Sequence, residues 1–284
     1  MLSAPYPPDR HVLRDLDVEM ESRPDGSASA WMPVVPALAS PWGGPMAGAL
    51  ATLVDMVAGG VSVRAAAPDW IATSDLSLSL TRPAAGAQVE ARGHVVRKGR
   101  STLIVGVELL DAPGEGRPGS GPPVGLAMVS FSILPRRETT LVIDPEAMSR
   151  SRFGGGGGRL DRHLVEAIGI DVVDASSGRV SLPLADYVRN SFGAVQGGIM
   201  ALVGEAAGAL AVADALGVKA AATVDLHVTY LALGKVGPIV TSASVRACDQ
   251  VRGDATVQLL DAGAGDRLTT VVHVGALAGG RGSR

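Results

Sequence analysis

The sequence contains few of the residues that would mark a disulfide-rich, metal-binding or nucleic-acid-binding protein. Cys248 is the single cysteine among 284 residues, so no internal disulfide can form and no cysteine-built zinc site is possible. The formal net charge is only −3, which does not indicate a nucleic-acid partner or an acidic membrane surface. The N-terminus lacks the basic and then apolar segments of a signal peptide. We therefore expect a cytoplasmic protein.

Long uninterrupted apolar runs are also missing. The two longest, 45–63 and 197–213, carry Asp55 and Glu205 near their middles and barely reach the ~20 residues that span a bilayer. We therefore expect core helices and no membrane partner. An ionised carboxylate in such a helix is costly unless it is paired, exposed or used in chemistry. The two acids are thus the first candidates for functional residues.

The sequence repeats itself at an offset of 150 residues. Six positions of the first copy match six of the second: Ser40, Gly43, Gly48, Leu50, Asp55 and Asp75 correspond to Asn190, Gly193, Gly198, Met200, Glu205 and Asp225. Farther upstream, "HVLRDLDVEM" matches "HLVEAIGIDV" with a shift of two residues. The repeat predicts two domains, 8–137 and 160–278, joined by a flexible connector at 138–159 that includes five consecutive glycines.

Each copy has the same predicted order of elements. A first strand near 28–34, or 178–184 in the second copy, precedes the apolar helix. Four segments with period-two alternation follow, with Gly, Pro and Asp at the breaks, which is typical of antiparallel strands. A helix that is apolar on every side is buried completely only where the sheet curls around it. The pattern therefore predicts an α+β fold.

The segment N-x-x-G-x-x-Q-G-G-x6-E at 190–205 resembles the hotdog fold, in particular acyl-CoA thioesterases of the phenylacetate-pathway (PaaI-like) and 4-hydroxybenzoyl-CoA types. Gln196 stands where these families commonly have histidine. Thr73 and Thr223, each two residues before an Asp, fit the same pattern. The resemblance implies two tandem hotdog domains, each a long central helix wrapped by an antiparallel sheet, paired as a pseudo-dimer.

The resemblance also implies two composite sites at the seam between the copies. The first site would combine Asp55 and Thr73 of the first copy with Asn190, Gln196, Gly197 and Gly198 of the second. The second site would combine Glu205 and Thr223 with Ser40 and Ala47. We expect the second site to be impaired, because Ser40 is shorter than an amide side chain and Ala47 adds a methyl group at the helix start.

The expected activity is hydrolysis of acyl-CoA thioesters. Free N–H groups at a helix N-terminus can stabilise the negative charge that develops on a thioester oxygen. A nearby carboxylate can then activate water or attack the carbonyl directly. Arg97, Lys98 and Arg100 could hold the phosphates of coenzyme A, or could be an ordinary solvated turn.

Other interpretations remain open at this stage. An enoyl-CoA hydratase or dehydratase of the same fold needs a catalytic histidine, and Gln196 and Met46 occupy the expected places. An acyl-CoA-binding protein without catalysis would use the same cleft. The acids could simply accept hydrogen bonds from the partner copy, Asn190 could be a turn residue, and the two threonines could merely favour strand structure.

The remaining expectations concern partners. Coenzyme A would be part of the substrate, and no separate cofactor or metal is indicated. The resembled families commonly pair their dimers, so we expect a homodimer of the double-hotdog chain. Nine aromatic residues leave the acyl pocket to be shaped mainly by Ala, Val, Leu and Met, and the sequence does not define which acyl group it accepts.

Overall fold

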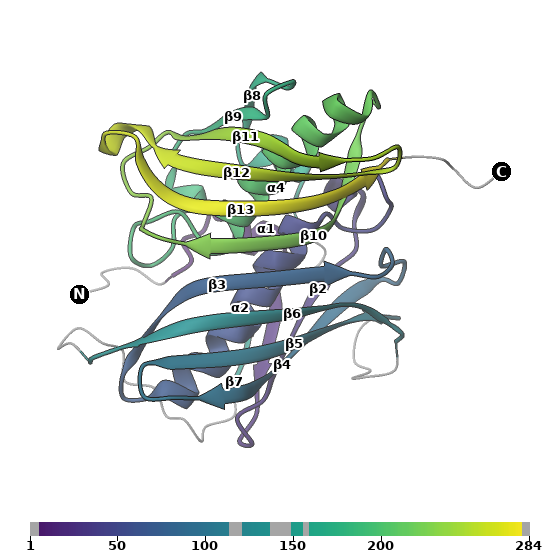
Figure 1. The fold of residues 1–284 in the computed structure, drawn as a ribbon. Coiled ribbons are helices and arrows are strands. Elements are labelled where there is room, and N and C mark those ends of the chain that lie inside the picture. Colours follow the sequence, from purple (N-terminus) through teal and green to yellow (C-terminus); the bar gives the residue numbers. More distant parts are fainter. Residues whose placement is uncertain (1–5, 114–120, 137–148, 156–158, 280–284) are drawn as a thin grey trace.

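The computed structural model describes residues 6–113, 121–136, 149–155 and 159–279. Their strands form one antiparallel sheet, and two long helices lie behind it (Figure 1). The first copy contains α1 (Val12–Asp15), β1 (Glu19–Ser22), β2 (Ala28–Pro33), the short 3-10 helix η1 (Pro36–Leu38), α2 (Ala47–Ala66), β3 (Trp70–Leu80), β4 (Gln88–Lys98), β5 (Thr102–Ala112) and β6 (Pro123–Leu134).

The second copy repeats this order. It contains α3 (Leu164–Ala167), β8 (Asp171–Asp174), β9 (Arg179–Leu182), η2 (Asp186–Val188), α4 (Gly197–Leu216), β10 (Ala221–Tyr230), β11 (Ile239–Cys248), β12 (Arg252–Asp261), η3 (Ala262–Ala264) and β13 (Arg267–Ala278). The elements α1 and β1 match α3 and β8 at the predicted shift of two residues. The short strands β1 and β8 were not predicted, because four residues are too few to show a period.

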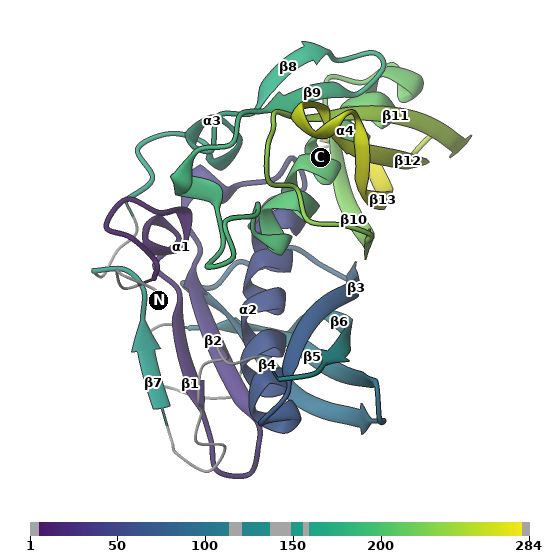
Figure 2. The ribbon, with the colours of Figure 1, turned by 90° about the vertical axis from the view of Figure 1, so that its left-hand side faces the viewer.

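The two copies share one continuous sheet, with strand order β7-β1-β2-β4-β5-β6-β3-β10-β13-β12-β11-β9-β8. The seam is the antiparallel pair β3 and β10, in which Asp75 lies opposite Thr229 and Ser79 opposite Asp225. Figure 2 shows β1, β2 and β7 on one side of α2 and β3, β5 and β6 on the other, with β4 between them, so that the sheet curls around the helix. The predicted tandem hotdog is confirmed.

The predicted connector is only partly covered by the described residues. Residues 149–152 form strand β7, which pairs with β1 at the edge of the sheet and so extends the first domain. Residues 137–148 and 156–158, which include three of the five consecutive glycines, lie outside the described residues. The domain boundaries themselves stay a prediction.

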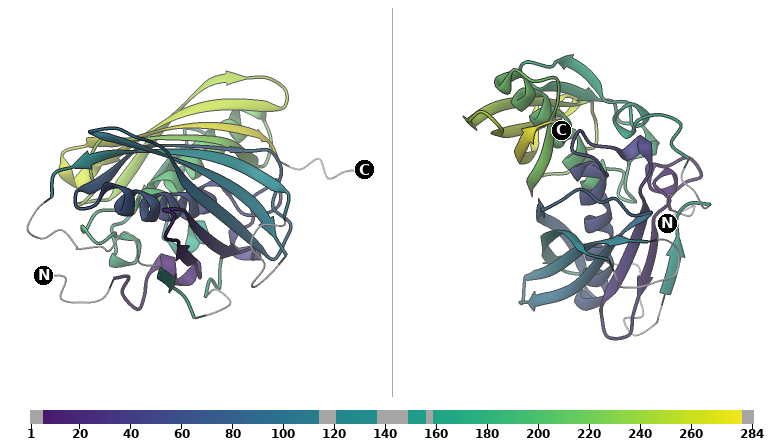
Figure 3. Two further views of the ribbon diagram at one scale, coloured as in Figure 1. Left: turned by 90° about the horizontal axis from the view of Figure 1, so that it is seen from below. Right: turned by 90° about the vertical axis from the view of Figure 1, so that its right-hand side faces the viewer.

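The helices α2 and α4 cross closely and run antiparallel beneath the sheet (Figure 3). Gly48 lies against the backbone of Leu202, and Gly198 lies against the backbone of Thr52. Both helices are long and apolar enough to cross a membrane, but most of their residues are buried in the fold. Their apolar character is therefore explained by a core that surrounds them on all sides.

The close approach of the helices should depend on the missing side chain at Gly48. A Cβ there would lie 2.5 Å from Leu202 Cα, so Gly48→Ala should destabilise the protein by about 1–3 kcal/mol, as overpacking does. Gly59 lies in the same helix with nothing within 4 Å of an added Cβ. Gly59→Ala should therefore stabilise by up to about 1 kcal/mol through helix propensity. Urea denaturation of both variants checks this, and equal effects would contradict it.

Candidate functional site

The carboxylate of Asp55 lies at the seam, between its own copy and the first turn of α4. Its Oδ1 accepts a hydrogen bond from the Thr73 hydroxyl at 3.1 Å. A Cβ added at Gly197 would lie 2.9 Å from Asp55 Oδ2, so the carboxylate stands directly over that α-carbon. The structure therefore brings together Asp55, Thr73 and Gly197 of the predicted first site.

A β-bulge directs Thr73 toward Asp55. Residues two apart in a regular strand share a face, but the pairing of β3 with β6 shifts between Thr73 and Asp75. Thr73 consequently points inward to α2, while Asp75 points outward and accepts from Thr229 at 3.2 Å. The pairing of β10 with β13 shifts in the same way between Thr223 and Asp225.

The N-terminus of α4 offers uncapped hydrogen-bond donors next to Asp55. Gln196 at the N-cap position makes no side-chain hydrogen bond to the helix. Within the described ranges, the N–H groups of Gly197 and Gly198 have no acceptor, although the first amides of a helix need one from outside. These donors, aligned with the helix dipole, suit an anion or a developing oxyanion.

Burial raises the pKa of Asp55 to about 6, and the hydrogen bond from Thr73 only partly opposes this effect. Protein atoms surround the carboxylate closely, yet the residue keeps some exposure to solvent. A carboxylate with a pKa near 6 is still ionised at pH 7 and is a stronger base than an ordinary Asp. Asp55 therefore has the raised pKa of a general base, in a residue that is partly exposed.

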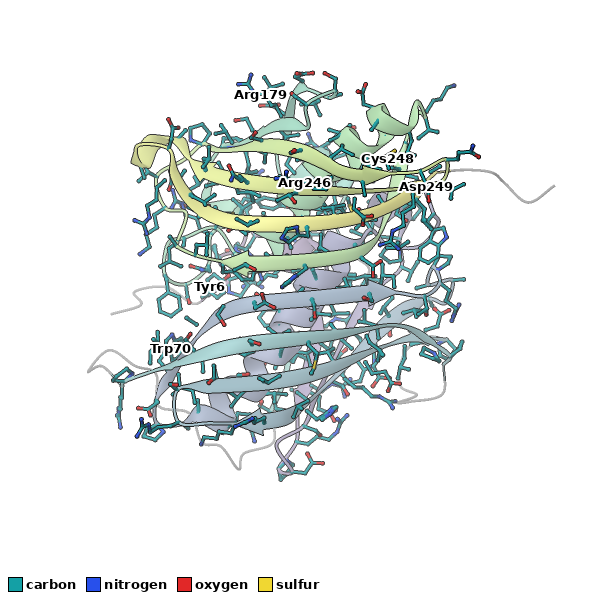
Figure 4. The ribbon with its side chains drawn as sticks, in the orientation of Figure 1. Tyr6, Trp70, Arg179, Arg246, Cys248 and Asp249 are labelled. Atoms are coloured by element: carbon teal, nitrogen blue, oxygen red, sulfur yellow. The ribbon has the colours of Figure 1, made fainter. Side chains whose placement is uncertain are left out.

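Aromatic residues gather around this end of the seam, although the chain has few of them. The ring of Trp70 packs edge-on against that of Phe192, with centroids 5.4 Å apart. Tyr6 and Trp70 lie on the same side of the molecule (Figure 4). Burial and, to a smaller extent, the charge of Asp55 raise the pKa of Tyr6 well above its usual range. These residues were not predicted to be part of the site.

Tyr230 was also missed by the sequence analysis. Its hydroxyl donates to the carbonyl oxygen of Gly197 at 3.0 Å. Burial, followed by the charges of Asp55 and Asp75, raises the pKa of Tyr230 well above its usual value. The sequence does contain one indication of a special role, because the corresponding residue of the first copy is Leu80, which has no hydroxyl.

The second site differs in one decisive contact. Glu205 Oε1 accepts from the Ala47 N–H at 3.0 Å, and Oε2 accepts from the Gly48 N–H at 2.6 Å. The carboxylate thus caps α2 and occupies the donors that an oxyanion would need. Only 3% of Glu205 is exposed. The structure places Ala47 and Glu205 together. We expected Ser40 and Ala47 to impair this site, but the Glu205 carboxylate itself closes it by occupying both donors.

Burial raises the pKa of Glu205 to about 7. The N–H groups of Gly48 and Ala47 oppose this effect, and the nearby Thr223 hydroxyl opposes it further. The site therefore holds an acid with a raised pKa, as the first site does, but without an open donor.

Asn190 and Ser40 hold their own loops together. Asn190 Oδ1 accepts from the N–H groups of Phe192 at 2.9 Å and Ala194 at 3.1 Å. The Ser40 hydroxyl donates to the Gly43 carbonyl at 3.1 Å. The amide of Asn190 thus orders the loop that carries Phe192, which is the turn role considered above. A direct role of Asn190 in chemistry stays a prediction.

The remaining predicted residues lie away from the carboxylates or make no polar contact with them. Arg97, near the end of β4, and Arg100, in the turn between β4 and β5, are both exposed. Lys98 Nζ donates to the carbonyl of Ala65 at 2.7 Å, at the C-terminal end of α2. Gln196 is buried, and its side-chain oxygen has no hydrogen-bond partner within the described chain.

A cavity of about 350 Å³ lies elsewhere, on the outer face of the sheet. His227, Arg246 and His273 are among its lining residues, and Figure 4 labels Arg246 on that face. Neither Asp55 nor Glu205 lines it. In the part of the chain that the structure describes, no group of three or more His, Cys, Asp or Glu is arranged to hold a metal ion.

Comparison with known proteins bears on the family and the fold of the chain. A model of the thioesterase superfamily matches residues 46–116. A protein of Halobacterium salinarum, described as a candidate esterase, is 36% identical over 124 residues, which are 40% of this chain and 82% of the relative. A solved candidate thioesterase II from Thermobifida fusca has a TM-score of 0.59 at 16% identity, over 89% of this chain and 92% of that one.

A second solved structure, an acyl-ACP thioesterase from Bacteroides thetaiotaomicron, has a TM-score of 0.54 at 11% identity. It covers 89% of this chain and 98% of its own. At these identities the two structures establish the fold over both copies of the repeat.

The buried charge of Asp55 should cost stability at neutral pH. Its pKa of about 6 lies above the ordinary value for Asp, so ionisation is disfavoured in the fold, and the cost grows as the pH rises and is complete above pH 6. Asp55→Asn removes this cost. The variant should unfold at a higher temperature than the parent at pH 8, by an amount equivalent to about 1–3 kcal/mol, and at a similar temperature at pH 4. Thermal unfolding followed by circular dichroism checks this, and a less stable variant at pH 8 would contradict it.

Proposed function

Because the chain belongs to the thioesterase superfamily, we propose that it hydrolyses acyl thioesters of coenzyme A at the first site, between α2 and the N-terminus of α4. One observation carries this proposal. The carboxylate of Asp55, a partly exposed residue, lies over Gly197, beside backbone donors that have no acceptor in the described chain. A base and an oxyanion-binding group thus converge on one small region.

The chemistry assigns each residue a separate step. The thioester carbonyl oxygen accepts hydrogen bonds from the Gly197 and Gly198 N–H groups. Asp55 takes a proton from a water molecule, whose oxygen attacks the carbonyl carbon. The C–S bond then breaks, Asp55 returns its proton to the departing thiolate of coenzyme A, and the acid and the thiol leave. Thr73 holds one oxygen of Asp55, so that the other is directed at the α4 terminus.

The basic turn supplies an anchor for the coenzyme A phosphates. Asp55 and Ala65 are ten residues apart in α2, which corresponds to about 15 Å along the helix. Arg97, near the end of β4, and Arg100, in the turn after it, lie close to that end of α2, because Lys98 between them bonds to the Ala65 carbonyl. An extended pantetheine arm could therefore lead from the carboxylate toward these exposed guanidinium groups, which recognise phosphate well.

The second site is inactive in this proposal. Its two donors are already used by Glu205, and a substrate oxygen would have to displace a buried carboxylate held by two hydrogen bonds. Glu205 then has a structural role as the cap of α2. A hydratase function is not favoured, since no histidine of the described chain hydrogen-bonds to either acid.

The two acids should differ in their effect on turnover. Asp55→Asn should lower kcat/KM by about 10²–10⁴-fold, because a positioned general base is lost. Glu205→Gln should retain activity within about fivefold, since it affects a closed site. Free thiol release from a panel of acyl-CoA substrates measures both. In the parent, kcat/KM should fall about tenfold per pH unit below pH 6, as Asp55 becomes protonated.

Glu205→Gln is the matched control for Asp55→Asn, because both changes replace an acid by its amide at equivalent positions of the two copies. A parent protein that releases no thiol from any acyl-CoA would overturn the proposed activity. Loss of activity in Glu205→Gln alone would reverse the assignment of the two sites.

The basic turn should contribute to binding of the nucleotide part. Arg97→Ala together with Arg100→Ala should raise KM for acyl-CoA by about tenfold, through loss of charge-assisted hydrogen bonds. The same pair should leave KM unchanged for acyl-N-acetylcysteamine, which has no phosphates. Arg179→Ala provides a control for the loss of an exposed arginine elsewhere, on β9 of the second copy (Figure 4). Equal effects on both substrates would show that the turn acts only through the fold.

A further inference from the structure

We propose that Tyr230 is a positioning residue that fixes the oxyanion-binding peptide at the start of α4. The inference rests on the proposed function of the first site and assigns to it a group that was not predicted. Tyr230 ends strand β10, at the end of the seam where β3 begins. Its hydroxyl bonds to Gly197 O, and its oxygen would lie 3.5 Å from a Cβ added at Gly197.

The strand directs the tyrosine inward. Thr229 points to the outer face, where it bonds to Asp75. Successive side chains of a strand alternate, so Tyr230 points toward α4. Its ring packs against the core, and its hydroxyl reaches the helix start from the sheet side. The hydroxyl and the carboxylate of Asp55 thus meet at the same α-carbon from two different elements.

The bond to Gly197 O controls an N–H group of the same peptide unit. The peptide group is planar and trans, so its C=O and N–H point in opposite directions. The carbonyl of Gly197 and the N–H of Gly198 form one such unit. A hydrogen bond that fixes the Gly197 carbonyl therefore also fixes the direction of the Gly198 N–H. A hydrogen bond accepted by the carbonyl also polarises the amide and strengthens its N–H as a donor.

Two glycines in sequence make this support necessary. Glycine has the widest choice of backbone conformations, so the peptide between Gly197 and Gly198 is the least restrained part of the helix start. Neither residue can carry a larger side chain there, because Asp55 and Thr52 stand in the way. A hydrogen bond from outside the helix, such as that from Tyr230, therefore restrains this peptide where side chains of the two residues themselves cannot.

The first copy lacks the hydrogen bond that Tyr230 makes in the second. Leu80 occupies the position that corresponds to Tyr230, and it has no hydroxyl to donate. The equivalent helix start is instead held from the donor side, by the Glu205 carboxylate. Tyr230 thus occurs only at the site whose donors are open.

Tyr230→Phe tests the proposal in the full-length protein. Removal of an oxyanion donor costs about 10²–10³-fold in kcat, and loosening one should cost less, about tenfold. KM should change less than twofold, because the hydroxyl does not touch the substrate. A trifluoromethyl ketone analogue of acyl-CoA, whose hydrate presents an oxyanion, should bind about tenfold more weakly. A thioether analogue without the carbonyl should bind unchanged.

Thr241→Val is the matched control. It removes a buried hydroxyl that donates to the Gly178 carbonyl at 2.8 Å, in the same copy but away from the first site. It should leave kcat unchanged even if it lowers stability. Equal losses of kcat in both variants would reduce Tyr230 to a structural role and overturn the proposal, and so would full activity of Tyr230→Phe.

A spectroscopic measurement separates this proposal from the proposed function. In protein labelled with ¹³C′ and ¹⁵N glycine, a one-bond ¹³C′–¹⁵N correlation arises only from Gly–Gly peptides, of which the chain has eight, including that between Gly197 and Gly198. The carbonyl and amide shifts of this peptide should move in Tyr230→Phe and stay in Thr241→Val. This readout needs no substrate. If the parent hydrolysed no thioester, the proposed function would fail, but the chemical shifts of this peptide would still test the role of Tyr230. Shifts that do not change in Tyr230→Phe would overturn that role.

Discussion

The close packing of α2 against α4 determines what every residue at the seam can reach. Gly48 and Gly198 allow the two backbones to approach, and the antiparallel crossing then places each mid-helix acid at the first turn of the other helix. The curled sheet buries both helices, which explains why their sequences are apolar on all sides. It also explains the raised pKa values of Asp55 and Glu205, because few polar groups remain nearby to solvate the charges.

Within this framework the extra methylene group of Glu205 makes the two acids bond differently. The longer side chain of Glu205 reaches two N–H groups of α2, whereas Asp55 accepts from Thr73 and leaves the N–H groups of α4 without an acceptor in the described chain. The same interaction that satisfies a buried acid therefore removes an oxyanion site. Stability and chemistry compete for the same donors, and each copy resolves the competition differently.

Much of the architecture could be predicted because it repeats. The offset of 150 residues identified both helices, both acids and the strand segments, and the shift of two residues upstream reappears in α1 and α3. The glycines were predicted for their place at a helix start, and the structure adds that Gly48 and Gly198 are also required for helix packing.

Other features depend on three-dimensional detail that no local pattern carries. The β-bulge sends Thr73 and Asp75 to opposite faces, although their spacing suggests one face. The capping of α2 by Glu205 depends on side-chain reach across two domains. Tyr230 is distant in sequence from Gly197, and its contact follows from the register of β10 with β3. The roles of Asn190 and of the basic turn stay predictions.

The fusion of two copies in one chain has a consequence for how such a protein can diverge. In a symmetric homodimer one gene encodes both seams, so a substitution that suits one catalytic pocket is imposed on its twin. Here the partner positions Tyr230 and Leu80, or Gly197 and Ala47, are separate codons. The residues of one composite site can therefore accumulate changes that only strengthen the scaffold, while selection on turnover acts on the residues of the other site.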